Sequence, residues 1–149
     1  MELADAIANY HLVGVDTNAF IYAYQEHPQY LSVVRPIFAR LDADPDFRVV
    51  TSTITLIEVI TQPMRLNRQD LVDTYTNALL RSPNVHTYPV DFVIARRAAE
   101  LRAQFNLRTP DAIQIATALV AQADAFITND ERFKGVQDIP ILIIGEYVQ

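Results

Sequence analysis

The sequence of 149 residues contains no cysteine and only three glycines, Gly14, Gly135 and Gly145. Without cysteine the chain forms no disulfide and no thiolate metal site, which is compatible with a reducing cytoplasm. Three scattered glycines cannot build a glycine-rich phosphate loop, so the nucleotide-binding fingerprints that depend on such loops are excluded. The apolar runs, such as residues 139–144, are too short to span a bilayer, and the first residues lack the basic segment of a signal peptide. We therefore expect a cytoplasmic protein with no membrane partner.

Composition and charge narrow the class of protein further. Half of the residues are apolar and one fifth are charged, so we expect a single globular domain over residues 1–149, with residues 1–10 as an N-terminal extension. The formal net charge of −6 is unfavourable for sequence-independent binding of nucleic acid, which normally relies on a basic surface. Two divalent cations at a site of four acids would change the charge from −6 to −2, so part of the acidity can belong to a metal site.

The apolar pattern predicts short strands that alternate with helices. The predicted strands are residues 11–15, 47–51, 85–88, 125–128 and 141–144. The predicted helices are residues 17–26, 29–41, about 53–62, 67–81, 91–105 and 111–121. The last helix, with Thr109 as its cap and Pro110 at its first position, is apolar nearly all round and should be covered on most sides. The alternation predicts an α/β fold with a central parallel sheet covered on both faces.

Four acidic residues fall at element boundaries or on helices of this pattern: Asp16, Glu58, Asp111 and Asp130. Asp16 and Asp130 each follow a predicted strand, so both should lie on the edge where the carboxyl ends of parallel strands meet. Asp111 lies in the first turn of one predicted helix and Glu58 lies within another, and both can lean over that edge. Four carboxylates in one place form a set of oxygen ligands that suits Mg²⁺ or Mn²⁺, and such sites commonly act on phosphodiesters.

Each acid taken alone also has a structural explanation. Asp16 can cap the helix that follows it, the dipole of its helix can stabilise Asp111, and Asp130 can open a turn. Glu58 can lie on a polar stripe, although its neighbours are so apolar that we expect little of the segment to face water. The three histidines are far apart in sequence and show no paired spacing, so no role is predicted for them. The joint placement of the four acids carries the prediction of a site.

Four segments around these acids together resemble the PIN domain family: Val15–Asn18, Glu58 in its apolar helix, Thr109–Ala118 and Phe126–Phe133. The resemblance extends from about His11 to Gly145 and is strongest to the VapC-type toxin ribonucleases. It implies a three-layer α/β/α fold with a parallel sheet of about five short strands, and cleavage of RNA that depends on Mg²⁺ or Mn²⁺. It also implies a homodimer and inhibition by a cognate antitoxin protein.

The resemblance assigns roles residue by residue. Asp16, Glu58, Asp111 and Asp130 match the four acids of the family, which implies that they are catalytic and hold one or two metal ions. Asn18 and Thr128 match polar residues that accompany the first and last acid, and we expect them to support the metal ligands. Arg108, Arg132 and Lys134 lie close in sequence to the acids, and they are candidates for holding flanking phosphates of the RNA.

Two other functions remain as alternatives. A phosphatase of the haloacid-dehalogenase type also has an acid at the end of its first strand, but its chemistry needs a second aspartate where this chain has Asn18. A non-catalytic PIN-like module that binds a protein would keep its acids as relics, and the presence of all four acids disfavours it. No residue pattern in the chain indicates which RNA would be cleaved.

Overall fold

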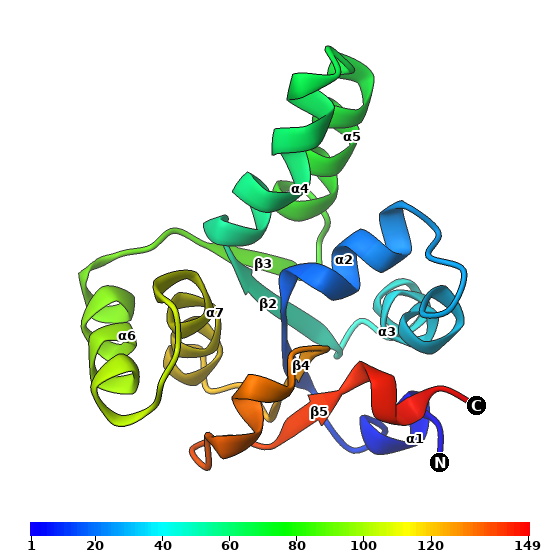
Figure 1. The fold of residues 1–149 in the computed structure, drawn as a ribbon. Helices are drawn as coiled ribbons and strands as arrows, with labels where there is room; N and C mark the ends of the chain where they lie inside the picture. Colours follow the sequence, from blue (N-terminus) through cyan, green and yellow to red (C-terminus); the bar gives the residue numbers. More distant parts are fainter.

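The structure, a computed structural model that describes residues 1–149, has a five-stranded sheet between two layers of helices (Figure 1). All neighbouring strands are parallel and lie in the order β3-β2-β1-β4-β5. The strands are β1 (Leu12–Val15), β2 (Arg48–Ser52), β3 (Val85–Tyr88), β4 (Ala125–Thr128) and β5 (Ile141–Ile143). The predicted α/β fold with a central parallel sheet is confirmed.

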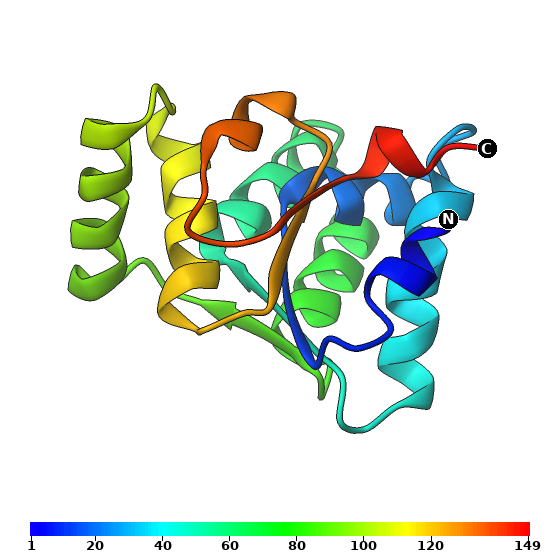
Figure 2. The same ribbon diagram turned by 90° about the horizontal axis from the view of Figure 1, so that it is seen from below.

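Helices cover both faces of this sheet, and Figure 2 shows α6 and α7 on one side with α1, α2 and α3 on the other. The helices are α1 (Leu3–Ala6), α2 (Thr17–Tyr24), α3 (Leu31–Ala43), α4 (Thr53–Arg65), α5 (Gln69–Leu80), α6 (Phe92–Gln104) and α7 (Thr109–Val120). Two short 3-10 helices, η1 (Glu131–Gly135) and η2 (Ile144–Tyr147), follow β4 and β5. None of the helices is long and apolar enough to cross a membrane.

The alternation of side chains along β1 divides the core into two parts. Val13 and Val15 belong to the buried cluster that includes residues of α1, α2 and α3. Gly14, between them, faces α7, and a Cβ added to it would lie 2.6 Å from the Cβ of Ala118. The absence of a side chain at Gly14 therefore lets α7 lie against the middle of the sheet. The second buried cluster is formed mainly by α6 and α7, with Phe126 of β4 and Phe133 of η1.

The order of the strands places a topological switch point between β1 and β4. From β1 the chain builds β2 and β3 on one side, and then crosses to the other side of β1 to form β4 and β5. The backbone N–H of Asp16 donates to the carbonyl of Ile127 at 2.9 Å, so the two strands stay in contact beyond the end of β1. In open parallel sheets, ligands bind at this kind of point, outside the carboxyl ends of the strands.

Several predicted helix boundaries were wrong. Pro63, expected to end α4, lies buried inside it, and the helix continues to Arg65. α4 packs against α5, and this hairpin projects away from the sheet (Figure 1). Because the hairpin projects, Ile57 is 58% exposed, contrary to the expectation that little of this segment faces water. At α7, Thr109 is the first helical residue rather than the cap, and Arg108 occupies the cap position.

The first ten residues pack against the rest of the chain. They contain the short helix α1, which was not predicted, and its Leu3 together with Ile7 is buried in the same cluster as β1. The guanidinium of Arg40 donates to the carbonyl of Ile7 at 2.6 Å and to the carbonyl of Tyr10 at 2.8 Å. The same guanidinium lies 4.1 Å from the ring centroid of Phe47. These contacts join the N-terminal segment to α3 and to the start of β2.

Candidate functional site

One small cavity of about 160 Å³ at the carboxyl edge of the sheet is lined by all four of the acids singled out in the sequence. The lining residues are Asp16, Thr17, Asn18, Ile21, Glu58, Arg108, Asp111 and Asp130. Asp16 ends β1, Asp130 follows β4, Asp111 begins α7 and Glu58 lies in α4. The cavity therefore gathers side chains from segments that are up to 114 positions apart in the sequence (130 − 16 = 114).

Asp16 is the most buried of the four acids, with 7% of its surface exposed. Its Oδ1 accepts a hydrogen bond from the backbone N–H of Thr17 at 2.9 Å, so it caps α2. Its Oδ2 accepts a hydrogen bond from the Thr128 hydroxyl at 2.8 Å. Burial raises the pKa of Asp16 to about 6, and the charges of Asp111 and Glu58 add to the rise while these hydrogen bonds oppose it. Asp16 thus both caps α2 and lines the cavity.

Thr128 connects the first acid to the last. It is fully buried at the end of β4, and the hydroxyl that donates to Asp16 also accepts a hydrogen bond from the backbone N–H of Asp130 at 3.1 Å. One side chain therefore fixes the Asp16 carboxylate relative to the turn that carries Asp130. The role expected for Thr128, support of the metal ligands, stays a prediction.

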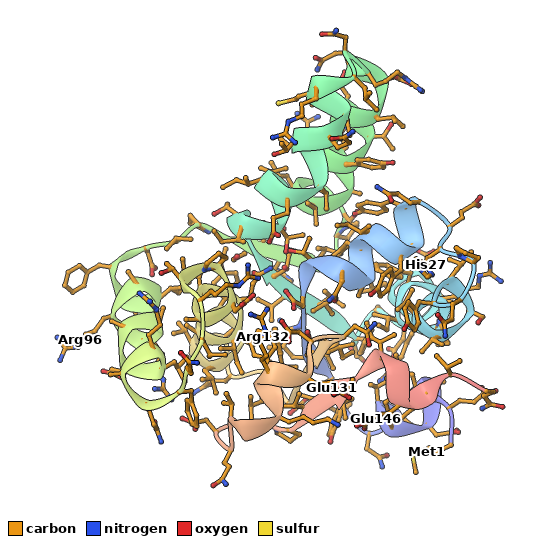
Figure 3. The ribbon with its side chains drawn as sticks, in the orientation of Figure 1. Met1, His27, Arg96, Glu131, Arg132 and Glu146 are labelled. Carbon is orange, nitrogen blue, oxygen red and sulfur yellow. The ribbon has the colours of Figure 1, made fainter.

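Arg132, labelled in Figure 3, belongs to η1 and binds two of the acids. Its guanidinium forms a two-pronged contact with the carboxylate of Asp130, and its Nη2 lies 3.4 Å from Oδ2 of Asp111. The hydrogen bond from Arg132 holds the pKa of Asp130 below its usual range. Arg108, 66% exposed, donates from Nε to the same Oδ2 of Asp111 at 3.1 Å. Two of the four carboxylates are thus neutralised by arginine.

No three acidic or histidine side chains are arranged in the structure as a group that could hold a metal ion. The chemistry of the donor set nevertheless fits a hard divalent cation, since the cavity contains four carboxylates and no sulfur or imidazole ligand. Asn18 adds a further oxygen. Its Oδ1 is buried and has no hydrogen-bond partner, which is a costly state for a polar atom unless a ligand satisfies it.

Lys134 does not lie in the cavity. Its Nζ is 2.6 Å from Glu146 and 3.4 Å from Glu131, and Figure 3 shows these two glutamates close to each other, below Arg132 in that view. The expectation that Lys134 holds a phosphate at the site was based on its closeness in sequence to Asp130. The 3-10 turn of η1 directs the Lys134 side chain toward η2, and its contact with a phosphate stays a prediction.

Sequence reasoning missed Thr17 and Ile21, which line the cavity, and Gln114, which contacts it from behind. Gln114 lies in α7 one turn after Asp111, is 3% exposed, and reaches Asp16, Thr17 and Thr55 through its side-chain amide. The sequence could have pointed to Gln114, because it is the one amide side chain in a helix that is otherwise almost wholly apolar. A buried amide in such a helix requires hydrogen-bond partners from another element.

A larger cavity, of about 480 Å³, lies between α2, α3 and α5. Its lining includes Phe20, Tyr24, Phe38 and Leu41, with Asp42 as its one acidic residue. Size alone would favour it as a ligand site, but it has no group of converging titratable side chains. The smaller acidic cavity is the better candidate for chemistry.

Solved structures of other proteins have a similar fold. The solved structures similar to this chain include a toxin–antitoxin complex from Klebsiella pneumoniae (TM-score 0.64, 23% identity, covering 89% of this chain and 96% of that one). They also include DNA-bound VapBC from Salmonella typhimurium (0.68, 18%, 89% and 97%). A third is VapC20 from Mycobacterium tuberculosis, described as a toxin that cleaves the sarcin-ricin loop (0.65, 18%, 85% and 95%).

At these identities the structural likeness shows a shared fold. A search of curated protein sequences gives no match. The sequence profile of the PIN domain family, however, matches residues 13–139. That span runs from the second residue of β1 to the segment after η1 and contains all four acids of the cavity. With most of its length matched in this way, the chain belongs to the PIN domain family.

Proposed function

We propose that this protein is a metal-dependent endoribonuclease and the toxin of a toxin–antitoxin pair. The observation that carries the proposal is the convergence of Asp16, Glu58, Asp111 and Asp130 on one cavity at the switch point of the sheet. The charges of Asp111 and Glu58 raise the pKa of Asp16, and a divalent cation would offset this repulsion. Phosphodiester hydrolysis is the chemistry to which such a site is suited.

In this proposal Asp16, Glu58, Asp111 and Asp130 hold Mg²⁺ or Mn²⁺, and Asn18 and Thr128 support them. When bound, the ion would make water more acidic and neutralise charge on the phosphate. The protein's own groups prepare the site. The hydroxyls of Thr17 and Thr128 hold Glu58 and Asp16 by hydrogen bonds of 3.0 and 2.8 Å, which fixes two carboxylates before any ion arrives.

The two arginines of the site are proposed to bind the RNA. Arg108 and Arg132 are 66% and 51% exposed, so their guanidinium groups are accessible to phosphate oxygens from solution. Arginine is the side chain best suited to two-pronged binding of phosphate. Both arginines now face carboxylates, and an ion at those carboxylates would release them toward the substrate.

The partners follow from family membership and from the solved structures of similar fold. Two of those structures are a toxin–antitoxin complex and a DNA-bound VapBC complex, and on this basis we propose a cognate antitoxin for this chain. A homodimer and a cytoplasmic location complete the proposal. Toxicity on expression, relieved by co-expression of a small protein encoded beside it, would support the toxin assignment.

The decisive experiment is incubation of the purified protein with mixed structured and single-stranded RNA in Mn²⁺. The proposal expects cleavage that EDTA abolishes and that Asp111→Asn abolishes. Asp138→Asn is the matched control, because Asp138 pairs with Arg97 outside the cavity and its loss should leave cleavage intact.

A folded wild-type protein that is free of inhibitor and cleaves no RNA in this mixture would contradict the proposal. Together with weak Mn²⁺ binding, that result would favour the non-catalytic binding module. Cleavage by the Asp111→Asn variant at the wild-type rate would likewise show that the four-carboxylate site does not catalyse the reaction.

A further inference from the structure

Gln114 is the polar residue at the centre of a buried hydrogen-bond network behind the acidic cavity. Its Nε2 lies 2.9 Å from the Thr17 hydroxyl, 2.8 Å from the Thr55 hydroxyl and 3.4 Å from Oδ1 of Asp16. Its Oε1 accepts a hydrogen bond from the Ser52 hydroxyl at 2.6 Å. With 3% of its surface exposed, Gln114 depends on these partners, because water cannot replace them.

The direction of the hydrogen bonds in this network is determined by the acid at its end. The hydroxyl of Thr17 has one proton, and it lies 3.0 Å from Oε1 of Glu58. An ionised carboxylate accepts hydrogen bonds only, so Thr17 donates its proton to Glu58. The Thr17 oxygen must therefore accept from Gln114, which turns the N–H end of the amide toward the acids. The Ser52 hydroxyl accepts from the backbone N–H of Ile54 and donates to the opposite end of the amide.

The result is a path of donors that leads from α7 to two acids on different elements. The amide has two protons, and its nearest acceptors are the hydroxyls of Thr17 and Thr55, so the 3.4 Å contact with Asp16 at the end of β1 shares one of these protons. The other branch is Gln114 to Thr17 to Glu58 of α4, with Thr55 of the same helix bonded to both Gln114 and Thr17. A shift of α7 against α4 or β1 would break these bonds. Gln114 thus couples the positions of two carboxylates that belong to separate parts of the fold.

We propose that Gln114 is a positioning residue that sets the spacing of Asp16 and Glu58 for the divalent ion. This inference rests on the proposed metal-dependent nuclease. Residues behind metal ligands fix the orientation of those ligands, and their loss typically weakens metal binding about 10- to 100-fold. Gln114 lies behind the cavity and does not line it, so its loss should affect ion binding and turnover and leave the contacts with RNA unchanged.

The test compares Gln114→Met with wild type in a Mn²⁺ titration of the metal-free protein, where the electron paramagnetic resonance signal reports free Mn²⁺. Methionine keeps the length of the side chain and removes its donors. The expected result is an affinity for Mn²⁺ weakened at least about tenfold. In the cleavage assay at fixed Mn²⁺, kcat should fall while KM for RNA stays unchanged.

Thr117→Val is the matched control for a purely structural role. Thr117 lies in α7 one turn after Gln114, is fully buried, and donates to the carbonyl of Ile113 within its own helix at 2.8 Å. Its loss should lower thermal stability and leave Mn²⁺ affinity unchanged. If Gln114→Met behaves in the same way, with lower stability and wild-type affinity for Mn²⁺, the proposal is overturned.

A second pair of variants interrupts the path at its middle, in case Gln114→Met does not fold. Thr17→Val removes the hydroxyl that connects Gln114 with Glu58, whereas Thr17→Ser keeps it. Thr17→Val should bind Mn²⁺ more weakly than Thr17→Ser. Equal affinities of these two variants would overturn the proposal independently of Gln114→Met.

The variant Asp111→Asn separates this inference from the proposed function. If wild type and Asp111→Asn bind Mn²⁺ equally, or if neither binds it, the metal site fails and the role of Gln114 fails with it. If Asp111→Asn weakens Mn²⁺ binding while Gln114→Met does not, the metal site stands and only the role of Gln114 is rejected.

Discussion

Replacing Asp16 by asparagine should stabilise the metal-free protein at neutral pH. The carboxylate of Asp16 is buried, and burial raises its pKa from 3.8 to about 6. At pH 7 the folded protein therefore holds a charge in a place that favours the protonated form. Asparagine has no charge, and its side-chain oxygen can still cap the backbone N–H of Thr17 as Asp16 does.

The size of the effect follows from the shift of the pKa. Its rise from 3.8 to about 6 corresponds to roughly 3 kcal/mol, at about 1.4 kcal/mol for each pH unit. Below about pH 4 the carboxyl group is protonated in the folded and unfolded states, so it costs nothing there. Between about pH 4 and pH 6 the folded state keeps a proton that the unfolded state has released, so the free energy of unfolding falls as the pH rises. Above about pH 6 the full cost is present.

The assay is thermal or urea denaturation in EDTA at a series of pH values from about 4 to 8. Between the two ends of this range, the stability of wild type relative to Asp16→Asn should fall by roughly 3 kcal/mol, or about 6–12 °C in Tm for a chain of this size. Taking this difference cancels the contributions of groups that both proteins share, such as Asp130, whose pKa is lowered. Asp42→Asn is the control for the loss of one exposed negative charge. Parallel curves for wild type and Asp16→Asn would refute the reasoning, since burial of the carboxylate would then carry no cost.

Two further perturbations test the packing behind the site and the arginine in front of it. Gly14→Ala should destabilise the protein by about 1–3 kcal/mol in thermal melts, because the new Cβ would lie 2.6 Å from the Cβ of Ala118. Gly135→Ala is the control and should leave stability unchanged, because its Cβ would meet nothing within 4 Å. Arg132→Gln should tighten Mn²⁺ binding, measured by calorimetry, because it frees the carboxylates that the guanidinium now holds. Lys134→Gln is the control, because it removes an equal charge that pairs only with glutamates outside the cavity. If Lys134→Gln raises the affinity for Mn²⁺ as much as Arg132→Gln does, the effect comes from net charge alone.

The strands and the class of fold could be predicted from local sequence because they depend on short-range patterns. β3 and β4 have the predicted bounds, and β1, β2 and β5 differ by a residue at their ends. Helix α4 did not follow its local signal, since Pro63 lies within it. Proline removes one helical hydrogen bond, and here the packing of α4 on α5 maintains the helix through that position. A contact between two helices cannot be read from the residues of one.

The placement of the acids was predictable to the extent that topology dictates it. Asp16 and Asp130 follow strands, and parallel strands end on one edge, so these two could be placed from the sequence alone. Lys134 could not be placed, because closeness in sequence to Asp130 does not determine the side to which a 3-10 turn directs a side chain. Its partners Glu131 and Glu146 were visible only in the folded chain.

Periodicity and residue type are local properties, so the order of strands and helices, the four carboxylates and their likeness to one family were evident without a structure. The folded chain alone reveals that Arg132 binds Asp130 and lies close to Asp111, and that Gln114 reaches Thr17 from a helix 97 positions away in the chain. The physical reason is that a hydrogen bond requires two groups within about 3 Å of each other in a defined direction. Such an arrangement depends on the packing of whole elements, and for Gln114 that packing depends on the missing side chain of Gly14, which lets α7 lie close to β1.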